Sequence, residues 1–330
     1  MKTTLPLEEN LADVAASEYA LTTQPKLLEF VSAVLQKVGV GREDAQTVAE
    51  VLVAADSRGI ESHGVARLES YYVNRIRSGK LKPKPNYHVV RETDTSIVYD
   101  ADNGLGHPIG KRAMEEVIHK AGQHGAAFGA VRNSNHYGIA GYYAMMALPY
   151  DMVGLASTNS VRYGAPTYGK DIMLGTNPLA FAIPTAEEPA FVLDFATTTV
   201  PRGKLEVYQR KEKSLEPGWA IDSKGQPTTR PSEALHGALL PLGGYGVENG
   251  GHKGFGLGLL VDIFCGVLSG GVFGNSLPLP NSAAQAGAIS HWFGAFRIDG
   301  FREPAEFKRD MDRELRDFKN SAKAPGQERI

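Results

Sequence analysis

The sequence predicts a mixed α/β fold in which a helical region is joined to a larger region built on a mixed sheet. In residues 25–77 the apolar side chains recur at helical spacing, whereas beyond a proline-broken linker at 80–88 short apolar runs alternate with helical segments. A chain of 330 residues is long enough for two domains. We therefore expect a helical domain at 1–80, completed by the C-terminal helix within 300–330, and an α/β domain at 81–299.

Each expected element follows from its local pattern. Residues 25–38 form a helix with Val31 and Leu35 on its inner face, and Gly39 ends it. Two more helices are predicted at 43–58 and at 64–77, the second with Tyr72 on its inner face. In the second region, strands are predicted at 95–100, 127–131, 152–157, 178–183 and 191–195, and helices at 110–121, 138–147, 258–268 and 307–320.

Composition excludes several classes of protein. The chain has 35 Lys and Arg against 37 Asp and Glu, without the basic balance of a nucleic-acid binder. Cys265 is the single cysteine, which rules out an internal disulfide and a cysteine zinc site and fits the cytoplasm. No histidine pair has metal-site spacing, so we expect no metal. The apolar segment 254–274 contains Asp262 and seven glycines, which favours a buried helix over a membrane span.

One glycine-rich stretch is similar to a dinucleotide-binding turn. Gly104, Gly106 and Gly110 lie between a predicted strand and a predicted helix, but their spacing is GxGxxxG and the usual acidic residue about 20 positions later is missing. Asp100 and Asp102 would also repel a pyrophosphate. We therefore expect a glycine turn that packs the strand against the helix, and a fold that is not of the Rossmann type.

The segment 55–72 holds the densest polar cluster. Ser62 is placed to cap the third helix, so that His63 lies in its first turn, where the helix dipole lowers the pKa of an imidazole. Arg67 is four residues further on and shares a helix face with His63. An arginine beside an acid–base group suits a substrate with a carboxylate next to a reducible carbonyl. The alternative is a capped helix with a surface His–Arg pair.

Four more segments carry candidate residues, each with a structural alternative. His136 follows a predicted strand, where α/β proteins place ligands, although its Asn/Ser-rich surroundings also suit a capping turn. Asn177 lies in a turn that enters a strand, and Asp194 interrupts an apolar run and needs partners if it is buried. Lys253 lies in the glycine-rich segment 243–258 before a helix, which is either an anion site or a flexible loop.

Taken together, these motifs resemble one family. SRGIESHGVARL, NSNHYGIAGYY, GTNPLAFAIP, LDFATT, GWAIDSKGQPTT and GGHKGFGLGLLVDIFCGVLSG resemble, in order over residues 25–330, the malate/L-lactate dehydrogenase family of non-Rossmann NAD(P)-dependent oxidoreductases. That group includes ureidoglycolate dehydrogenase, 2,3-diketogulonate reductase, sulfolactate dehydrogenase and piperideine-2-carboxylate reductase. The resemblance implies a cofactor domain of the family's own type at 81–299. It also implies a homodimer or a dimer of dimers, with the active site near the subunit contact.

The resemblance also implies roles for particular residues. His63 or His136 would be the proton donor, and Arg67, beside Ser62, would bind the substrate carboxylate. The positions that match the family's cofactor-binding segments are Ser160, Asn177, Asp194, Phe195, Ala196, Thr197, Lys253 and Gly254.

The expected function is reversible hydride transfer between NAD or NADP and a 2-hydroxy acid/2-oxo acid pair. One alternative is NADPH-dependent reduction of a cyclic imino acid such as piperideine- or pyrroline-2-carboxylate, for which the same arginine would hold the carboxylate. Another is a non-catalytic metabolite-binding protein that has kept the fold. No nucleic acid or membrane partner is expected.

Overall fold

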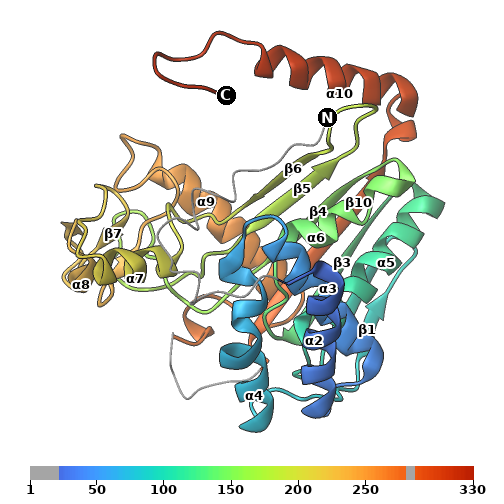
Figure 1. Ribbon diagram of the computed structural model, residues 1–330, viewed down its shortest axis with the longest axis horizontal. Helices are drawn as coiled ribbons and strands as arrows, with labels where there is room; N and C mark the ends of the chain where they lie inside the picture. Colours follow the sequence, from blue (N-terminus) through green and yellow to red (C-terminus); the bar gives the residue numbers. More distant parts are fainter. Residues whose placement is uncertain (1–21, 280–286) are drawn as a thin grey trace.

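A seven-stranded sheet forms the centre of the computed structural model, which describes residues 22–279 and 287–330 (Figure 1). The strand order is β1-β2-β3-β10-β4-β5-β6. Among these strands, β2 and β3 run parallel, and every other neighbouring pair is antiparallel. The expected mixed, non-Rossmann fold is therefore confirmed. The strands are β1 His88–Glu92, β2 Ser96–Asp100, β3 Ala126–Ser134, β4 Met152–Thr158, β5 Leu179–Ile183, β6 Phe191–Phe195 and β10 Ile289–Arg297.

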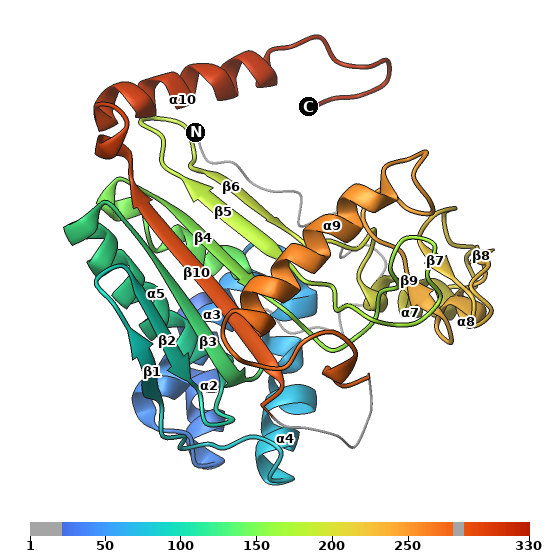
Figure 2. The ribbon, with the colours of Figure 1, turned by 180° about the vertical axis from the view of Figure 1, so that it is seen from behind.

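Helices cover both faces of the sheet. Helices α5 (Gly106–His124) and α6 (Ala140–Met145) cover one face, and α9 (Gly251–Asp262), which continues as a π-helical turn at Ile263–Val267, crosses the other (Figure 2). The core between the sheet, α5 and α6 is fully buried and includes Tyr143 and Phe293. The predicted strands and helices of this region are present, and their ends differ by up to four residues. The exception is the helix predicted at 258–268, which begins seven residues earlier, at Gly251.

The N-terminal helices α2 (Gln24–Lys37) and α3 (Arg42–Asp56) form the second core, in which Val31, Leu35 and Leu52 are buried. The prediction of one regular helix at 64–77 was wrong. This segment consists of two 3₁₀ turns (Glu61–His63 and Val65–Arg67), a π-helical turn (Leu68–Val73) and the short α4 (Asn74–Arg77). The helix is interrupted for a local reason. Gly64 has an extended backbone, and the Asp56 carboxylate accepts a hydrogen bond from the Val65 N–H at 2.9 Å.

Sequence reasoning missed the central strand β10 and a small lobe. Ser290, His291 and Gly294 interrupt the apolar pattern of β10, so no clear strand signal remained. The lobe contains α7 (Arg202–Arg210), α8 (Pro231–Ala234) and a three-stranded sheet of β7 (Ala220–Ile221), β8 (Pro227–Thr228) and β9 (Ala238–Leu239). Its core is separate from that of the main sheet.

The last helix, α10 (Pro304–Lys319), lies at the end of the molecule opposite α2 and α4 (Figures 1 and 2). Its Asp312 carboxylate accepts the backbone N–H groups of three residues in the turn between β5 and β6, at 2.9–3.1 Å. Arg316 and Lys319 pair with Glu188 in the same turn. The expected division at residue 80 stays a prediction. Among the described residues, no helix is long and apolar enough to cross a membrane.

Candidate active site

The structure brings the two predicted histidines together. The rings of His63 and His136 are stacked, with centroids 5.4 Å apart and planes inclined by 26°. His63 comes from the 3₁₀ turn after α3, and His136 comes from the loop that follows β3. Segments 73 positions apart in sequence thus supply two imidazoles to one place, at the carboxyl end of a central strand.

Arg67 belongs to the same cluster. Its Nε donates a hydrogen bond of 2.7 Å to the Ser62 carbonyl, while the side chain stays exposed. The Ser62 hydroxyl lies 2.9 Å from Nδ1 of His63. The expectation that Ser62 caps a helix was therefore wrong, because Asp56 receives the backbone N–H at this point. An exposed guanidinium beside two imidazoles can bind a carboxylate whose neighbouring carbon faces the rings.

Both histidines have a lowered pKa. Burial lowers the pKa of His63, and the charge of Arg67 lowers it further. Burial also lowers the pKa of His136 to well below its ordinary value, with His63 as the next cause. The expected direction for His63 is therefore found, but burial and Arg67 produce the shift, because His63 ends a single 3₁₀ turn.

Two residues of this cluster were not among the predicted site residues. The Tyr72 hydroxyl lies 2.6 Å from Nδ1 of His136 and 3.3 Å from Nε2 of His107. Tyr72 and His107 are both fully buried. Helical spacing had placed Tyr72 on an inner face, but no local signal indicated that this face meets a histidine loop.

The glycine turn packs α5 against this loop. A Cβ at Gly106 would lie 2.8 Å from the His136 carbonyl oxygen and closer still to that of Asn135. A side chain is therefore excluded at the point where α5 begins. The expectation of a packing turn is confirmed, and the strand–turn–helix resemblance arises because β2, α5 and β3 form a parallel β-α-β unit.

Three of the predicted cofactor residues meet around one turn. The Ser160 hydroxyl accepts the Thr176 N–H at 3.0 Å, and the Thr197 hydroxyl donates to the Thr176 carbonyl at 3.1 Å. The next residue, Asn177, donates from Nδ2 to the Gly258 carbonyl on α9 at 2.8 Å. Its Oδ1 is buried and has no hydrogen-bond partner among the described residues. This unused acceptor fits an amide or hydroxyl donor such as a nicotinamide cofactor carries.

Asp194 is partnered by the backbone. Its carboxylate accepts the Gly141 N–H at 2.7 Å, in the first turn of α6, and no described histidine is hydrogen-bonded to it. Burial raises the pKa of Asp194, and the Gly141 N–H partly offsets this. The neighbouring Phe195 closes β6, and Ala196 follows it towards Thr197.

Lys253 lies in the first turn of α9, exposed to solvent. It lines an open groove of about 400 Å³ together with Leu242 and Gly250. A cation beside the first turn of a twelve-residue helix suits a phosphate group. Gly254 also lines the groove, but a Cβ there would lie 2.5 Å from the Leu242 nitrogen, so close packing alone requires a glycine.

One buried histidine connects these halves of the site. His291 on β10 hydrogen-bonds the Ser134 hydroxyl at the end of β3 and the Thr158 hydroxyl at the end of β4, each at 2.8 Å.

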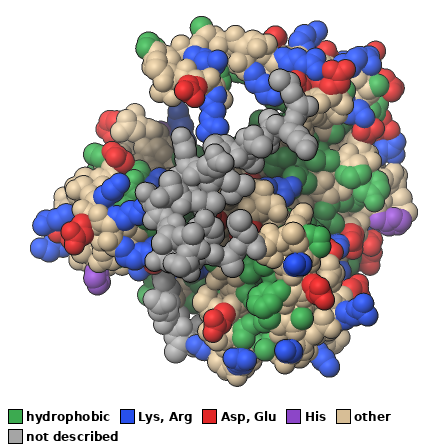
Figure 3. All heavy atoms as spheres, viewed as in Figure 1, with side chains coloured by type: hydrophobic (Ala, Val, Ile, Leu, Met, Phe, Trp, Pro, Cys, Tyr) green, Lys and Arg blue, Asp and Glu red, His purple; other side chains and the backbone are tan. Residues whose placement is uncertain are grey.

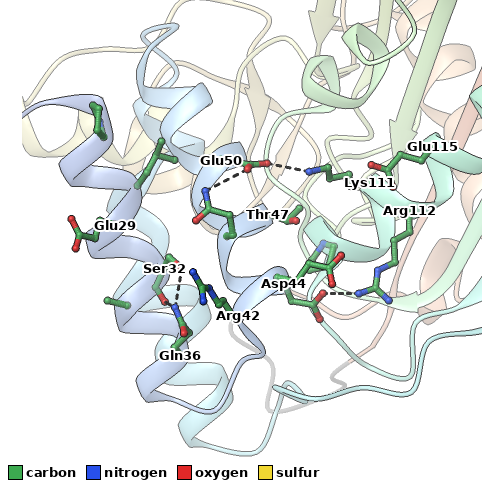
Figure 4. Close-up of a pocket in the computed structure, with 16 residues that line it drawn as sticks. Glu29, Ser32, Gln36, Arg42, Asp44, Thr47, Glu50, Lys111, Arg112 and Glu115 are labelled. Atoms are coloured by element: carbon green, nitrogen blue, oxygen red, sulfur yellow. Dashed lines mark hydrogen bonds and ion pairs between the residues drawn. The ribbon is translucent and has the colours of Figure 1, made fainter.

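A cavity of about 1010 Å³ lies elsewhere, between α2, α3 and the start of α5 (Figure 4). Ion pairs cross it from Glu50 to Lys111 and from Asp44 to Arg112. It contains none of the predicted site residues. Within residues 22–279 and 287–330, no group of three histidine, cysteine or acidic side chains could hold a metal ion.

Comparison with known proteins agrees with the motifs. A family model described as malate/L-lactate dehydrogenase matches residues 22–330. Malate dehydrogenase of Pyrococcus abyssi is 47% identical over 94% of this chain and 85% of its own length. L-sulfolactate dehydrogenase of Methanocaldococcus jannaschii is 39% identical over 90% and 84%. The solved structure of malate dehydrogenase from Pyrococcus horikoshii matches with a TM-score of 0.85 and 44% identity, over 94% of this chain and 85% of that one. The chain therefore belongs to the malate/L-lactate dehydrogenase family, and it is a dehydrogenase.

Proposed function

We propose that this dehydrogenase interconverts a 2-hydroxy acid and a 2-oxo acid, with Arg67 binding the carboxylate and the two histidines facing the C2 oxygen. The observation that carries the proposal is the stacked pair His63 and His136, 5.4 Å apart, in the field of Arg67. An arginine and an imidazole so close together meet the needs of a carboxylate and the adjacent carbonyl. The names of two relatives, malate dehydrogenase and L-sulfolactate dehydrogenase, state substrates of this kind.

His63 is the proton donor in reduction and the acceptor in oxidation. Its Nδ1 partner is the Ser62 hydroxyl, which can donate or accept, so the ring keeps this hydrogen bond with or without the second proton. The lowered pKa of His63 favours loss of that proton to the oxygen as the carbonyl is reduced. The imidazolium then becomes a neutral imidazole, which is the form that the reverse reaction requires.

The cofactor is NAD or NADP, which when bound supplies or accepts the hydride at C2. Ser160, Asn177 and Thr197 would hold its nicotinamide and ribose groups, since they meet around one turn and Asn177 has a free buried acceptor. Asp194, Phe195 and Ala196 would border the same site. Lys253, with Gly254 beside it, would face the phosphates.

The assembly is a homodimer or a dimer of dimers, and the proposed compartment is the cytoplasm. Helix α9 and its π-helical extension bury one side against the sheet, but Leu260, Ile263 and Val267 on the other side are exposed. Apolar stripes of this kind on a folded domain mark contact surfaces. A second copy of the chain is the proposed occupant, and sedimentation equilibrium that finds only monomer would contradict this.

The test of the chemistry is His63→Ala. We expect the rate of oxo-acid reduction to fall by about 10²- to 10⁴-fold, the usual contribution of a general acid. The affinity for NAD(P)H, measured by fluorescence titration, should stay native. His119→Ala, which removes an exposed histidine on the outer side of α5, is the matched control and should keep the native rate. A near-native rate for His63→Ala would transfer the proton-donor role to His136.

A substrate panel tests the reaction class. Malate, lactate and sulfolactate, their oxo acids, and the cyclic imines piperideine- and pyrroline-2-carboxylate are assayed with both NAD(H) and NADP(H). Turnover of an oxo acid supports the proposal, whereas turnover of the imines alone would establish the alternative.

A further inference from the structure

The hydrogen bonds around His136 determine which ring nitrogen carries its proton. The backbone N–H of Gly138 donates to Nδ1 of His136 at 3.2 Å. A backbone N–H can only donate, so Nδ1 is unprotonated. The Tyr72 hydroxyl lies 2.6 Å from the same nitrogen and must therefore also donate its proton to it.

The direction of hydrogen-bond donation can also be assigned between His107 and Tyr72. Because Tyr72 has given its only proton to His136, its oxygen can only accept from Nε2 of His107, at 3.3 Å. Nδ1 of His107 is buried and has no partner among the described residues, so a proton placed there would have no acceptor. Burial also lowers the pKa of His107 to about 3, which keeps this ring neutral.

We propose that Gly138, Tyr72 and His107 lock His136 as the Nε2–H tautomer, so that it gives a hydrogen bond to the substrate's C2 oxygen and does not itself supply the proton. Tyr72 and His107 are thus positioning residues. The inference rests on the proposed function, in which both histidines face that oxygen.

The fixed tautomer of His136 gives the two histidines different roles. Protonation of His136 at Nδ1 would break the bond from Gly138. Tyr72 could then accept the new proton only by turning its own proton towards Nε2 of His107, which would move the His107 proton to an Nδ1 that has no partner among the described residues. Loss of the Nε2 proton of His136 would leave an imidazolate. His63 has neither obstacle, because its Nδ1 partner is a hydroxyl that can reverse its direction. A neutral imidazole that polarises a carbonyl by hydrogen bonding, next to a separate acid–base group, is an established arrangement in enzymes.

The direct test is nitrogen NMR of the full-length protein labelled with ¹⁵N-histidine. We expect the Nδ1 resonance of His136, assigned by its loss in His136→Gln, at the position of an unprotonated nitrogen, with a proton on Nε2. In Tyr72→Phe this Nδ1 resonance should shift or divide between two tautomers. A protonated Nδ1 in the wild type, or an unchanged resonance in Tyr72→Phe, would overturn the proposal.

Kinetics provide the second readout. Tyr72→Phe and His107→Ala should lower kcat by about threefold to tenfold, the worth of one neutral hydrogen bond, with substrate and cofactor KM values nearly unchanged. His107→Gln, which restores an N–H donor, should recover part of the loss. Tyr142→Phe is the control, since it also removes a hydrogen bond of a tyrosine hydroxyl, to the Glu50 carboxylate at 3.4 Å, and should leave the His136 resonances in place. Equal kcat losses in Tyr142→Phe and Tyr72→Phe would reduce Tyr72 to a structural role.

These outcomes are separable from those of the proposed function. The ¹⁵N spectrum reports the tautomer of His136 without turnover. This measurement therefore remains valid even if replacing His136 leaves the rate unchanged. An unchanged rate in His63→Ala would contradict the assignment of the proton donor while the tautomer measurement remains valid.

Discussion

Replacement of Gly106 by alanine tests whether the glycine turn serves packing or nucleotide binding. The added Cβ would lie 2.8 Å from the His136 carbonyl oxygen and nearer still to that of Asn135, whereas ordinary contact begins at 3.4 Å. Both carbonyls belong to backbone and cannot rotate away. The Asn135 oxygen is the nearer of the two, so the loop that carries His136 must move by about 1 Å, or α5 must shift.

The substitution should lower both the stability of the protein and its kcat. Overpacking of this kind costs about 1–3 kcal/mol in the free energy of unfolding, and each kcal/mol lowers Tm by roughly 2–4 °C in a domain somewhat smaller than this one. Displacement of a catalytic group by about 1 Å can cost 10²-fold in rate. Because the loop carries His136 and can share the shift with α5, we expect kcat to fall by about tenfold to a hundredfold, with the KM for NAD(P)H nearly unchanged.

The assay combines thermal unfolding with steady-state kinetics in which oxo acid and cofactor are varied separately. Gly122→Ala is the matched control on the same helix, because its Cβ would meet only the end of Met152, at 3.8 Å. The control should be neutral or slightly more stable, by up to about 1 kcal/mol. A native Tm and kcat in Gly106→Ala would refute the packing argument. A raised cofactor KM with native kcat would instead place the nucleotide at this turn.

Two further predictions concern other parts of the chain. Lys253→Ala should raise the KM for NAD(P)H by about tenfold to a hundredfold, since a charged hydrogen bond is worth about 1.5–3 kcal/mol. The neighbouring His252→Ala should leave this KM unchanged, and equal KM values for the two variants would remove Lys253 from the cofactor site. Asp312→Ala should lower Tm and speed hydrogen exchange at the Glu187 and Glu188 amides. Burial raises the pKa of Asp312, but the three backbone N–H groups and Arg316 outweigh it, so the net pKa is lowered. Its stabilisation is therefore complete above the ordinary Asp range of about 3.9 and is lost as the pH falls through the folded-state pKa. A Tm difference between the wild type and Asp312→Ala that persists at still lower pH would contradict this.

The local pattern was sufficient for most of the main elements. The period of the apolar residues predicted α2, α3 and α5, and the apolar runs of β4, β5 and β6 were long enough to show as strands. It was insufficient for β10, because buried Ser290 and His291 break the apolar pattern. The partners of the His291 ring, the Thr158 and Ser134 hydroxyls, come from the ends of other strands, and the Ser290 backbone N–H donates to Asn159 Oδ1.

The candidate site likewise contains residues that the sequence identified and residues that only the structure revealed. Sequence motifs by themselves singled out His63, Arg67 and His136. The first two belong to a polar cluster within an apolar pattern, and the third follows a predicted strand. Only the tertiary structure decided that Tyr72 and His107, from segments 35 positions apart, complete the environment of His136. Periodicity tells which side of a helix is buried, but it carries no information about which distant segment meets that side. Tautomer, pKa and hydrogen-bond direction depend on that meeting, and so they became readable only in the folded chain.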